Sequence, residues 1–477
     1  MATKRYITRS YGYPETARTA RKLLRLLDVG AVKPETEVFD EATLEWKTLR
    51  EVEPFATHLA KEEELRQRGA EAFAKEKHFC RPVLYSIIGL GVLLTAGVVA
   101  FVVASLFDVM IVGLGDLPEI PRAKAELVWK FVVDEPLSSS PFYADGRLYF
   151  GSEDGYLYCV NAEDGHGLWK HDTGGPIIGE PLVIDGKVYI GSCDNALWCF
   201  DAETGKRLWR FATGFYIGGG IFSDGESVYF GSYDHRLYCL DADTGTERWS
   251  FETADWVFST PFVSETEVYF GSFDGRLYCL DKTTGTERWS YNTNSQIKSS
   301  PYLWEGKLYF GADDTFLYCL DAETGERLWR WHEADYRNFI RSRMVVFDGR
   351  VYLGCYNQRI YCVDAASGEL IWKRDTTNTV ETGGCLVGTT PEGGEFVIGQ
   401  SYTRPASFTE EPAYTELQFL IGGANGSLYN IDGVTGEPIW GFAAKAHILS
   451  DPAYADGRAF FASEDGRVYA VDTVEAD

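Results

Sequence analysis

The chain has 477 residues, which is more than one ordinary domain needs, and it is rich in aromatic residues (15 %) and in glycine (49 residues). Its net charge of −26 is unevenly placed: residues 1–82 carry 16 basic and 14 acidic side chains, whereas the remainder carries 29 and 57. Because so acidic a surface repels phosphates, we exclude nucleic acid as a partner of the larger part. The negative charge either keeps the protein soluble or attracts a basic partner.

Residues 1–56 are predicted to form a small α+β module. We expect a first strand at 6–11, a helix from Pro14 to Gly30 and two further strands at 36–39 and 46–49. This order resembles the bacterial GYF_2-like module, which implies a cytoplasmic partner. The matching positions are Leu23, Leu24, Arg25, Leu26, Leu27, Gly30, Val32, Pro34, Thr36, Val38 and Trp46. Trp46 is predicted to lie in the core of the module. Residues 57–82 are charged and predict a helical linker.

Residues 83–107 contain no charged side chain and predict a transmembrane helix, since about 20 apolar residues cross the hydrocarbon layer. Five basic residues lie shortly before this segment, at Arg66, Arg68, Lys75, Lys77 and Arg81. Only Arg122 and Lys124 follow at a similar distance. The positive flank places the N-terminus in the cytoplasm and the rest of the chain outside, as a single-pass protein of the cell membrane. Residues 108–125 form a second linker.

Eight tryptophans organise residues 126–477. The first six are spaced 40 residues apart and the last two gaps are 43 and 68 residues: Trp129, Trp169, Trp209, Trp249, Trp289, Trp329, Trp372 and Trp440. A repeat of this length matches four short strands with their turns, which is one propeller blade. Each unit carries a turn such as Asp201-Ala202-Glu203-Thr204-Gly205, in which the aspartate bonds its own turn and the glycine takes the left-handed conformation.

The count predicts an all-β, eight-bladed β-propeller. The last unit ends at Tyr469-Ala470-Val471-Asp472 before any tryptophan, while Trp129 precedes the first unit without a turn of its own. We therefore expect the N-terminal strand around Trp129 to complete the last blade, which removes the exposed edges of an open array. The tryptophans are the structural docking residues.

The repeated sequence resembles the quinoprotein, or PQQ-like, propeller repeat, whose signature is A-x-D-x-x-T-G-x-x-x-W. One non-enzymatic relative in that class is the outer-membrane assembly lipoprotein BamB. The signature's alanine is replaced by cysteine in six blades, at Cys159, Cys199, Cys239, Cys279, Cys319 and Cys362. Equivalent sites in adjacent blades lie too far apart for disulfides, so we expect buried free thiols. No cysteine and histidine spacing predicts a metal site.

If the chain were an enzyme of the quinoprotein class, the resemblance would imply a pair of adjacent cysteines, a calcium ion with carboxylate and amide ligands, and a catalytic aspartate. No two cysteines are neighbours here; the nearest are Cys193 and Cys199. Blades of 40 residues leave little room for the insertions that build such sites. We therefore expect no catalytic residue and no cofactor, and PQQ with calcium enters only under the alternative of a quinone-dependent oxidoreductase.

Residues that differ between blades are better guides to function. The innermost strand of each blade is expected to carry an aliphatic residue at one register: Leu137, Ile177, Ile217, Val257, Ile297, Ile340, Val380 and Ile448. The residues next to this aliphatic position differ between blades, and we expect them to face the channel or the next blade. They supply the candidate ligand-binding residues Tyr216, Trp256, Gln296, Phe339 and His447 on one level and Lys298, Arg341 and Glu381 on another. The alternative is that they only fill the channel.

The gap before Trp440 is 28 residues longer than the regular spacing, and most of the excess lies within 389–416. Such a loop predicts either a partner contact or a harmless insertion. Together these features predict a membrane-anchored, non-catalytic scaffold whose extracytoplasmic propeller binds a protein or a small ligand. Two alternatives remain: a PQQ-dependent oxidoreductase and an envelope protein-assembly factor similar to BamB.

Overall fold

The computed structural model describes residues 125–333, 339–399 and 411–473, together with five short strands within residues 5–48. The chain divides into two compact units, Met1–Asp116 and Leu117–Asp477. The described part contains no helix, and hence no apolar helix long enough to cross a membrane. The predicted membrane segment at 83–107 and both linkers lie outside the described residues.

The N-terminal unit contains a small antiparallel sheet. Its strands are β1 (Arg5–Ser10), β2 (Tyr13–Pro14), β3 (Arg18–Thr19), β4 (Glu37–Asp40) and β5 (Glu45–Thr48). The order is β2-β1-β4-β5, and β3 also pairs with β1. The three predicted strands are therefore present. Pro14 lies in strand β2 and Arg18–Thr19 form strand β3, and both strands pair with β1, so no helix begins at Pro14. The apolar positions 20–27 of the predicted helix lie outside the described residues.

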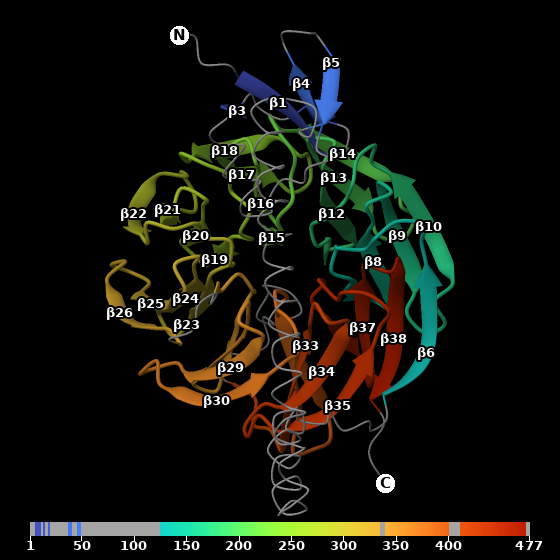
Figure 1. The fold of residues 1–477 in the computed structure, drawn as a ribbon, viewed down its shortest axis with the longest axis vertical. Helices are drawn as coiled ribbons and strands as arrows, with labels where there is room; N and C mark the ends of the chain where they lie inside the picture. Colours follow the sequence, from blue (N-terminus) through green and yellow to red (C-terminus); the bar gives the residue numbers. More distant parts are fainter. Residues whose placement is uncertain are drawn as a thin grey trace, which may run out of the picture. The chain divides into compact units, whose positions relative to one another are not determined.

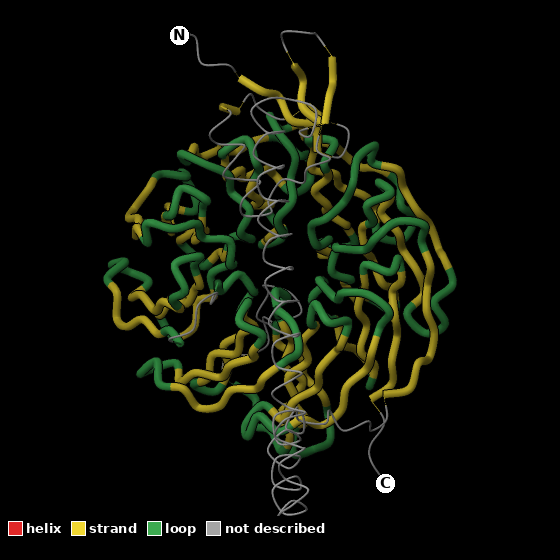
Figure 2. The backbone as a smooth tube through the Cα atoms, viewed as in Figure 1, coloured by secondary structure: helices red, strands yellow, loops and turns green. Residues whose placement is uncertain are grey.

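The second unit consists of eight antiparallel sheets, each a blade of four strands apart from blade 7, which has five. Figure 1 shows these blades arranged as a ring, and Figure 2 shows that strands and loops alternate throughout it. The strands of blades 1 to 4 are β7 (Phe142–Ala144), β8 (Arg147–Gly151), β9 (Tyr156–Asn161), β10 (Gly167–Asp172); β11 (Leu182–Ile184), β12 (Lys187–Ser192), β13 (Ala196–Asp201), β14 (Arg207–Ala212); β15 (Ile221–Ser223), β16 (Ser227–Gly231), β17 (Arg236–Asp241), β18 (Glu247–Glu252); and β19 (Phe262–Val263), β20 (Glu267–Gly271), β21 (Arg276–Asp281), β22 (Glu287–Asn292).

Blades 5 to 8 continue the same order around the ring. Their strands are β23 (Tyr302–Trp304), β24 (Lys307–Gly311), β25 (Leu317–Asp321), β26 (Arg327–Trp331); β27 (Val345–Phe347), β28 (Arg350–Cys355), β29 (Arg359–Asp364), β30 (Leu370–Asp375); β31 (Gly384–Thr389), β32 (Glu395–Ile398), β33 (Glu416–Gly422), β34 (Ser427–Asp432), β35 (Pro438–Ala443); and β36 (Ala453–Ala455), β37 (Arg458–Ser463), β38 (Arg467–Thr473) with β6 (Ala125–Val132).

The ring closes where its first strand meets its last one. Strand β6 pairs antiparallel with β38, and Trp129 stands opposite Ala470, just as each other blade tryptophan stands opposite its repeat residue. In Figure 1 the cyan β6 lies beside the red β38. The predicted completion of the eighth blade by the N-terminal strand is thus confirmed, and it covers an edge that would otherwise be open.

Seven of the eight tryptophans are seen docked on the turn of the next blade. Trp129 Nε1 donates a hydrogen bond to the Ala162 carbonyl at 3.0 Å. Gly165 of the same turn has φ +76°, and a Cβ built there would lie 2.6 Å from the indole. Glycine is therefore required both by the backbone and by the ring. The same bond recurs for six further tryptophans: Trp169, Trp209, Trp249, Trp289, Trp329 and Trp372. Trp440 is 4 % exposed.

A second contact between blades lies nearer the axis. The eight aliphatic residues predicted as core are at most 1 % exposed. A Cβ on Gly151 of blade 1 would lie 2.0 Å from Ile177 of blade 2, and Gly191 and Gly231 meet Ile217 and Val257 in the same way. These aliphatic side chains therefore fill the space that the preceding blade's glycine leaves.

The cysteines behave as small apolar core residues. The six repeated thiols are all buried and free, as expected, and each stands opposite its own blade's tryptophan, as in Cys199 and Trp209. Burial raises the pKa of Cys199 to about 12, so the thiol stays protonated and unreactive at neutral pH.

The long segment in blade 7 is partly structural. Strand β32 adds a fifth strand beside β31, and its Phe396 packs against Phe347 of blade 6. Beyond the undescribed residues 400–410, the Glu411 carboxylate accepts a 2.7 Å hydrogen bond from Trp304 Nε1 of blade 5. The Tyr454 hydroxyl of blade 8 donates to Glu395 at 2.9 Å. The insertion thus contacts the blades on both sides; whether it also meets a partner stays a prediction.

Candidate functional site

The candidate residues lie at one end of the inner strands. Within a blade, a residue in the turn after the second strand donates its backbone N–H to the carbonyl of the residue that precedes the buried aliphatic position. Examples are Tyr233 to Tyr216 at 3.1 Å and Phe273 to Trp256 at 2.8 Å. The donor residues, one in each blade, form a ring that the sequence patterns did not single out: Glu153, Cys193, Tyr233, Phe273, Asp313, Tyr356, Ala424 and Glu464.

Blades 3 and 4 contribute a chain of aromatic side chains. The rings of Tyr216 and Tyr233 are 4.6 Å apart, those of Tyr233 and Trp256 are 4.8 Å apart, and those of Trp256 and Phe273 are 5.6 Å apart. All four are half-buried, unlike the core rings such as Tyr229 and Phe230. Large aromatic faces that the fold does not fully cover are typical of binding sites.

Blades 5 and 6 contribute an ionic centre around Asp313. Its carboxylate receives two hydrogen bonds from Arg341, at 2.7 and 2.9 Å, and lies 3.1 Å from Lys298 Nζ. Burial lowers the pKa of Lys298, although the charge of Asp313 opposes that shift. Burial also disfavours the charge of Arg341, but the hydrogen bonds and charge of Asp313 outweigh it and raise the pKa of that guanidinium. Both cations are therefore held by one carboxylate.

The aromatic chain and the ionic centre are continuous. Lys298 Nζ lies 5.0 Å from the centre of the Phe273 ring, so a cation–π contact joins blade 5 to blade 4. Arg341 stacks on Phe339 at 4.9 Å and on Tyr356 at 4.7 Å, and it donates a 3.0 Å hydrogen bond to the Tyr356 hydroxyl. Burial and then Glu381 of blade 7 raise the pKa of Tyr356.

We call this set the axial cluster; it consists of Tyr216, Tyr233, Trp256, Phe273, Lys298, Asp313, Phe339, Arg341, Tyr356 and Glu381. The structure therefore brings together six of the eight predicted candidates. Gln296 touches the cluster through its main chain, which accepts the Asp313 N–H at 2.9 Å. His447 does not join it: the side chain is exposed and pairs with Glu464 in blade 8 at 3.0 Å.

A buried ion triad crosses the axis and was not found from the sequence. Arg343 of blade 6 lies 3.3 Å from the Glu180 carboxylate of blade 2 and 2.9 Å from that of Asp451 in blade 8. Blades 6 and 2 stand opposite each other in a ring of eight, so this contact exists only across the axis. All three residues occupy the same register, three positions after the buried aliphatic residue.

With both carboxylates ionised, the triad carries one excess negative charge. Burial raises the pKa of Glu180 to about 7; Arg343 opposes this shift and Asp451 adds to it. Asp451 also accepts hydrogen bonds from the Gly383 N–H at 2.5 Å, and its own N–H donates to the Ser140 hydroxyl at 2.9 Å. The side chains of blades 2, 6 and 8 thus occupy the axis at this level.

The acidic side chains of the described residues are spread over the blades and do not form a cluster. Within 125–333, 339–399 and 411–473, no three His, Cys, Asp or Glu side chains gather to hold a metal ion. The acidic turn residues repeat with the fold and are structural: Asp201 accepts hydrogen bonds from both the N–H and the hydroxyl of Thr204. The calcium ligands that the quinoprotein resemblance implies do not fit this part of the chain.

The fold and its docked tryptophans define a PQQ-type eight-bladed propeller. The model of the family described as outer membrane protein assembly factor BamB matches residues 119–216, 200–274, 264–381 and 356–477. The chain belongs to this family. No curated protein sequence matches it significantly.

Solved structures share the fold at low sequence identity. BamB from Moraxella catarrhalis is 16 % identical with a TM-score of 0.58, and the match covers 73 % of this chain and all of that one. The computationally designed Ika8 protein is also 16 % identical, with a TM-score of 0.60 and the same coverage. A europium-containing methanol dehydrogenase is 12 % identical with a TM-score of 0.56, covering 73 % of this chain and 93 % of the enzyme. BamB, a designed protein and a dehydrogenase thus share this architecture.

Proposed function

We propose that the protein is a membrane-anchored, non-catalytic binding protein whose extracytoplasmic propeller binds a protein segment or a small ligand at the axial cluster. The observation that carries this proposal is the continuous run of half-buried aromatic rings beside the Asp313 ionic centre. A regular repeat would place the same residue at equivalent positions of every blade, but at the positions of the axial cluster neighbouring blades carry different residues.

The chemistry of the axial cluster fits a ligand with apolar and polar parts. The rings of Tyr216, Tyr233 and Trp256 offer faces for stacking, and Lys298 and Arg341 offer N–H groups already oriented by Asp313. The Arg343 triad occupies the axis three residues further along the inner strands, which favours a site that a ligand enters from one face over a through-going pore.

The anchoring part of the proposal rests on the uncharged segment 83–107. Strands alternate in direction within each blade, so β6 begins on the face that carries the docking turns, beside the end of β38. The axial cluster lies on the other face. The chain therefore enters the propeller at Ala125 on the face opposite the axial cluster.

Two other functions share the fold. A quinone-dependent oxidoreductase is supported by the likeness to a methanol dehydrogenase, but the described residues lack a metal-ligand set. An envelope protein-assembly factor is supported by the family to which the chain belongs. The second alternative is itself a binding function, and it names one class of partner for the same surface.

The test compares two half-buried tryptophans in the full-length protein. A photo-crosslinking residue is placed at Trp256 in the axial cluster and, as the matched control, at Trp331 on the outer strand β26. We expect one partner to be captured from membranes at position 256 and not at 331, and Arg341→Ala to abolish the capture. Equal capture at both positions would contradict the site. Alcohol oxidation by the same preparation after addition of PQQ and calcium would contradict the non-catalytic role.

A further inference from the structure

The two cations of the axial cluster are not saturated by the protein. Arg341 has five N–H donors and uses three of them, two on Asp313 at 2.7 and 2.9 Å and one on the Tyr356 hydroxyl at 3.0 Å. Lys298 has three N–H donors, and its Nζ lies 3.1 Å from the same Asp313 carboxylate. Among the residues that the structure describes, no other acceptor meets these two side chains, so each keeps two N–H groups for a ligand.

These donors are open to solvent. The side chains of Lys298 and Arg341 are 19 % and 26 % exposed, whereas Asp313, which orients both, is only 11 % exposed. A group that enters the cluster therefore finds the cations more accessible than the carboxylate that holds them. Because Asp313 already fixes their positions, little further ordering is needed when a ligand binds.

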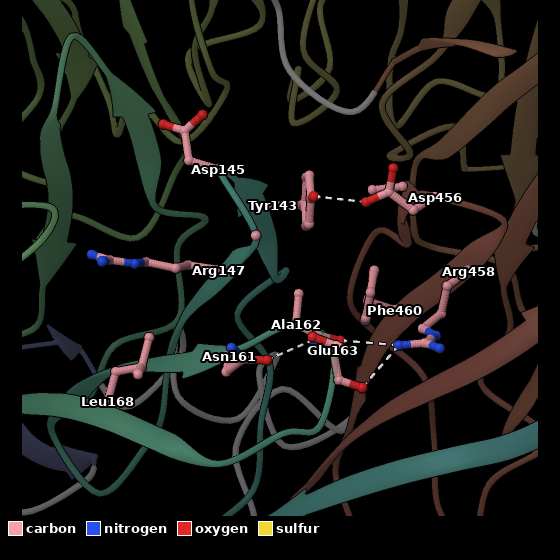
Figure 3. Close-up of a pocket in the computed structure, with 12 residues that line it drawn as sticks. Tyr143, Asp145, Arg147, Asn161, Ala162, Glu163, Leu168, Asp456, Arg458 and Phe460 are labelled. Carbon is pink, nitrogen blue, oxygen red and sulfur yellow. Dashed lines mark hydrogen bonds between the residues drawn. The ribbon is translucent and has the colours of Figure 1, made fainter. Parts of the chain in front are cut away.

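A cation at the outer seam of blades 8 and 1 shows the contrasting case. Figure 3 shows Arg458 beside a cavity of about 510 Å³, reaching across the seam to the turn of blade 1. It donates to the Ala162 and Glu163 carbonyls at 3.3 and 3.0 Å. In five other blades a tyrosine hydroxyl donates to the corresponding turn carbonyl, as Tyr189 does to Ala242 at 3.1 Å. Arg458 thus makes the bond between blades that the repeat requires, whereas Lys298 and Arg341 belong to no such repeated contact.

The charges of the axial cluster favour a ligand with one negative charge. Lys298 and Arg341 supply two positive charges, and the Asp313 that they share supplies one negative charge. Glu381 acts on Lys298 less than Asp313 or Arg341 does. Burial lowers the pKa of Lys298 even with Asp313 beside it, so the charge of this lysine is not fully compensated. A single carboxylate supplies the charge that Lys298, Arg341 and Asp313 leave unbalanced.

An apolar wall lies directly beside the free donors. Lys298 Nζ is 5.0 Å from the centre of the Phe273 ring, and that ring is 5.6 Å from the ring of Trp256. Both rings are half-buried, so part of each remains uncovered by the protein. An acid whose carboxylate reaches Lys298 therefore brings an attached apolar body onto Phe273 and Trp256.

We propose that the axial cluster binds a small organic acid, with its carboxylate on Lys298 and Arg341 and its apolar body on Phe273 and Trp256. This inference rests on the proposed function of the axial cluster and names the class of its ligand. A small acid is favoured over an acidic protein, because residues 83–477 carry 57 acidic against 29 basic side chains and repel a large polyanion more strongly than a single charge.

The test uses the full-length protein with 3-phenylpropionate as the probe and 3-phenylpropanamide as its neutral isostere. Binding is measured at pH 7 by isothermal titration calorimetry. Lys298→Met removes the charge and retains an unbranched apolar stem. The control is Lys187→Met, because Lys187 is similarly exposed, at 21 %, and also pairs with one aspartate, Asp243, but lies at the seam of blades 2 and 3.

We expect the acid to bind and the amide to bind at least about tenfold more weakly, because only the acid makes charge-assisted hydrogen bonds. Lys298→Met should lose a similar factor for the acid, and Lys187→Met should bind it as the native protein does. Thermal unfolding of both variants checks that they fold. Equal affinities for acid and amide would overturn the proposal, as would a Lys187→Met variant that loses as much affinity as Lys298→Met. Tighter binding of acetyl-Ala-Glu-Ala-amide than of the acid would overturn it in favour of an acidic protein partner.

The crosslinking experiment at position 256 separates this inference from the proposed function. If a partner is captured there but the protein does not prefer the acid to the amide, the ligand class is wrong and the binding site stands. If no partner is captured and the acid does not bind, both the ligand class and the axial site are wrong.

Discussion

The contacts between blades repeat at the outer seams of the propeller, whereas the residues at its axis differ from blade to blade. At the outer seams one contact recurs, an indole stacked on a left-handed glycine and bonded to a turn carbonyl, and seven tryptophans make it. At the axis, structurally equivalent positions carry tyrosine, phenylalanine, aspartate, glutamate, cysteine or alanine. The repeat therefore maintains the ring, and the departures from the repeat are the places to look for function.

The sharpest test of this contrast replaces one tryptophan of each kind. Trp249→Ala removes a docked indole and its 3.0 Å hydrogen bond to the Lys282 carbonyl, and should lower the free energy of unfolding by about 3–5 kcal/mol. Trp256→Ala in the axial cluster should cost about 1 kcal/mol while impairing ligand binding. Chemical denaturation measures both. A loss below about 1 kcal/mol for Trp249→Ala would contradict docking.

A second test concerns the charges that cross the axis. The pKa of Glu180 is raised from its ordinary value of 4.5 to about 7, chiefly by burial. A raised folded-state pKa favours folding below pH 4.5, and this contribution is lost as the pH rises through 7. Glu180→Gln should therefore match the native protein near pH 4 and exceed it in stability by at most about 3 kcal/mol near pH 8.

The pH dependence of that difference is the readout, because a purely structural effect would be constant with pH. Denaturation midpoints are compared at pH 4, 6 and 8. Glu203→Gln, an exposed turn residue of blade 2, serves as the control and should follow the native curve. A difference between Glu180→Gln and the native protein that is the same at all three values would contradict the buried, charge-unbalanced triad.

The smallest effect separates two glycines of the repeat. Gly205 has φ +68°, and a Cβ there would lie 2.6 Å from Trp169, whereas Gly146 has φ +72° and no atom within 4 Å. Gly146→Ala should cost about 1 kcal/mol from the backbone alone. Gly205→Ala should cost about 2 kcal/mol, because the indole must also shift. Thermal unfolding would show the order, and equal costs would mean that the indole does not rest on the turn.

The fold was largely predictable because its determinants are local and repeated. The spacing of the tryptophans gave the blades, and the unmatched Trp129 gave the closure with β38. Strand β32 was missed, although Glu395-Phe396-Val397-Ile398 has a strand-like composition, because the regular repeat has no fifth strand. The helix expected from Pro14 does not begin there, because Pro14 lies in β2 and pairs with β1, a contact that apolar spacing cannot show.

The site was predictable only in part. The register of the inner strands pointed to Lys298 and Arg341. Asp313, which binds both, lies in the turn after β24 of blade 5, outside that register. The Arg343 triad joins positions separated by 163 and 108 residues, and only closure of the ring brings them together. Sequence spacing cannot show such contacts, although the single arginine at a register otherwise occupied by small, polar or acidic residues was a signal that could have been read.

The pairing of β6 with β38 also imposes an order on biosynthesis. Strand β6 leaves the ribosome before any other strand of the propeller, but its partner is translated more than 300 residues later. Until then the nascent chain holds an unpaired strand beside a growing arc, which is the state in which aggregation threatens. A chain that stops before β38 leaves β6 without its partner strand and the ring open.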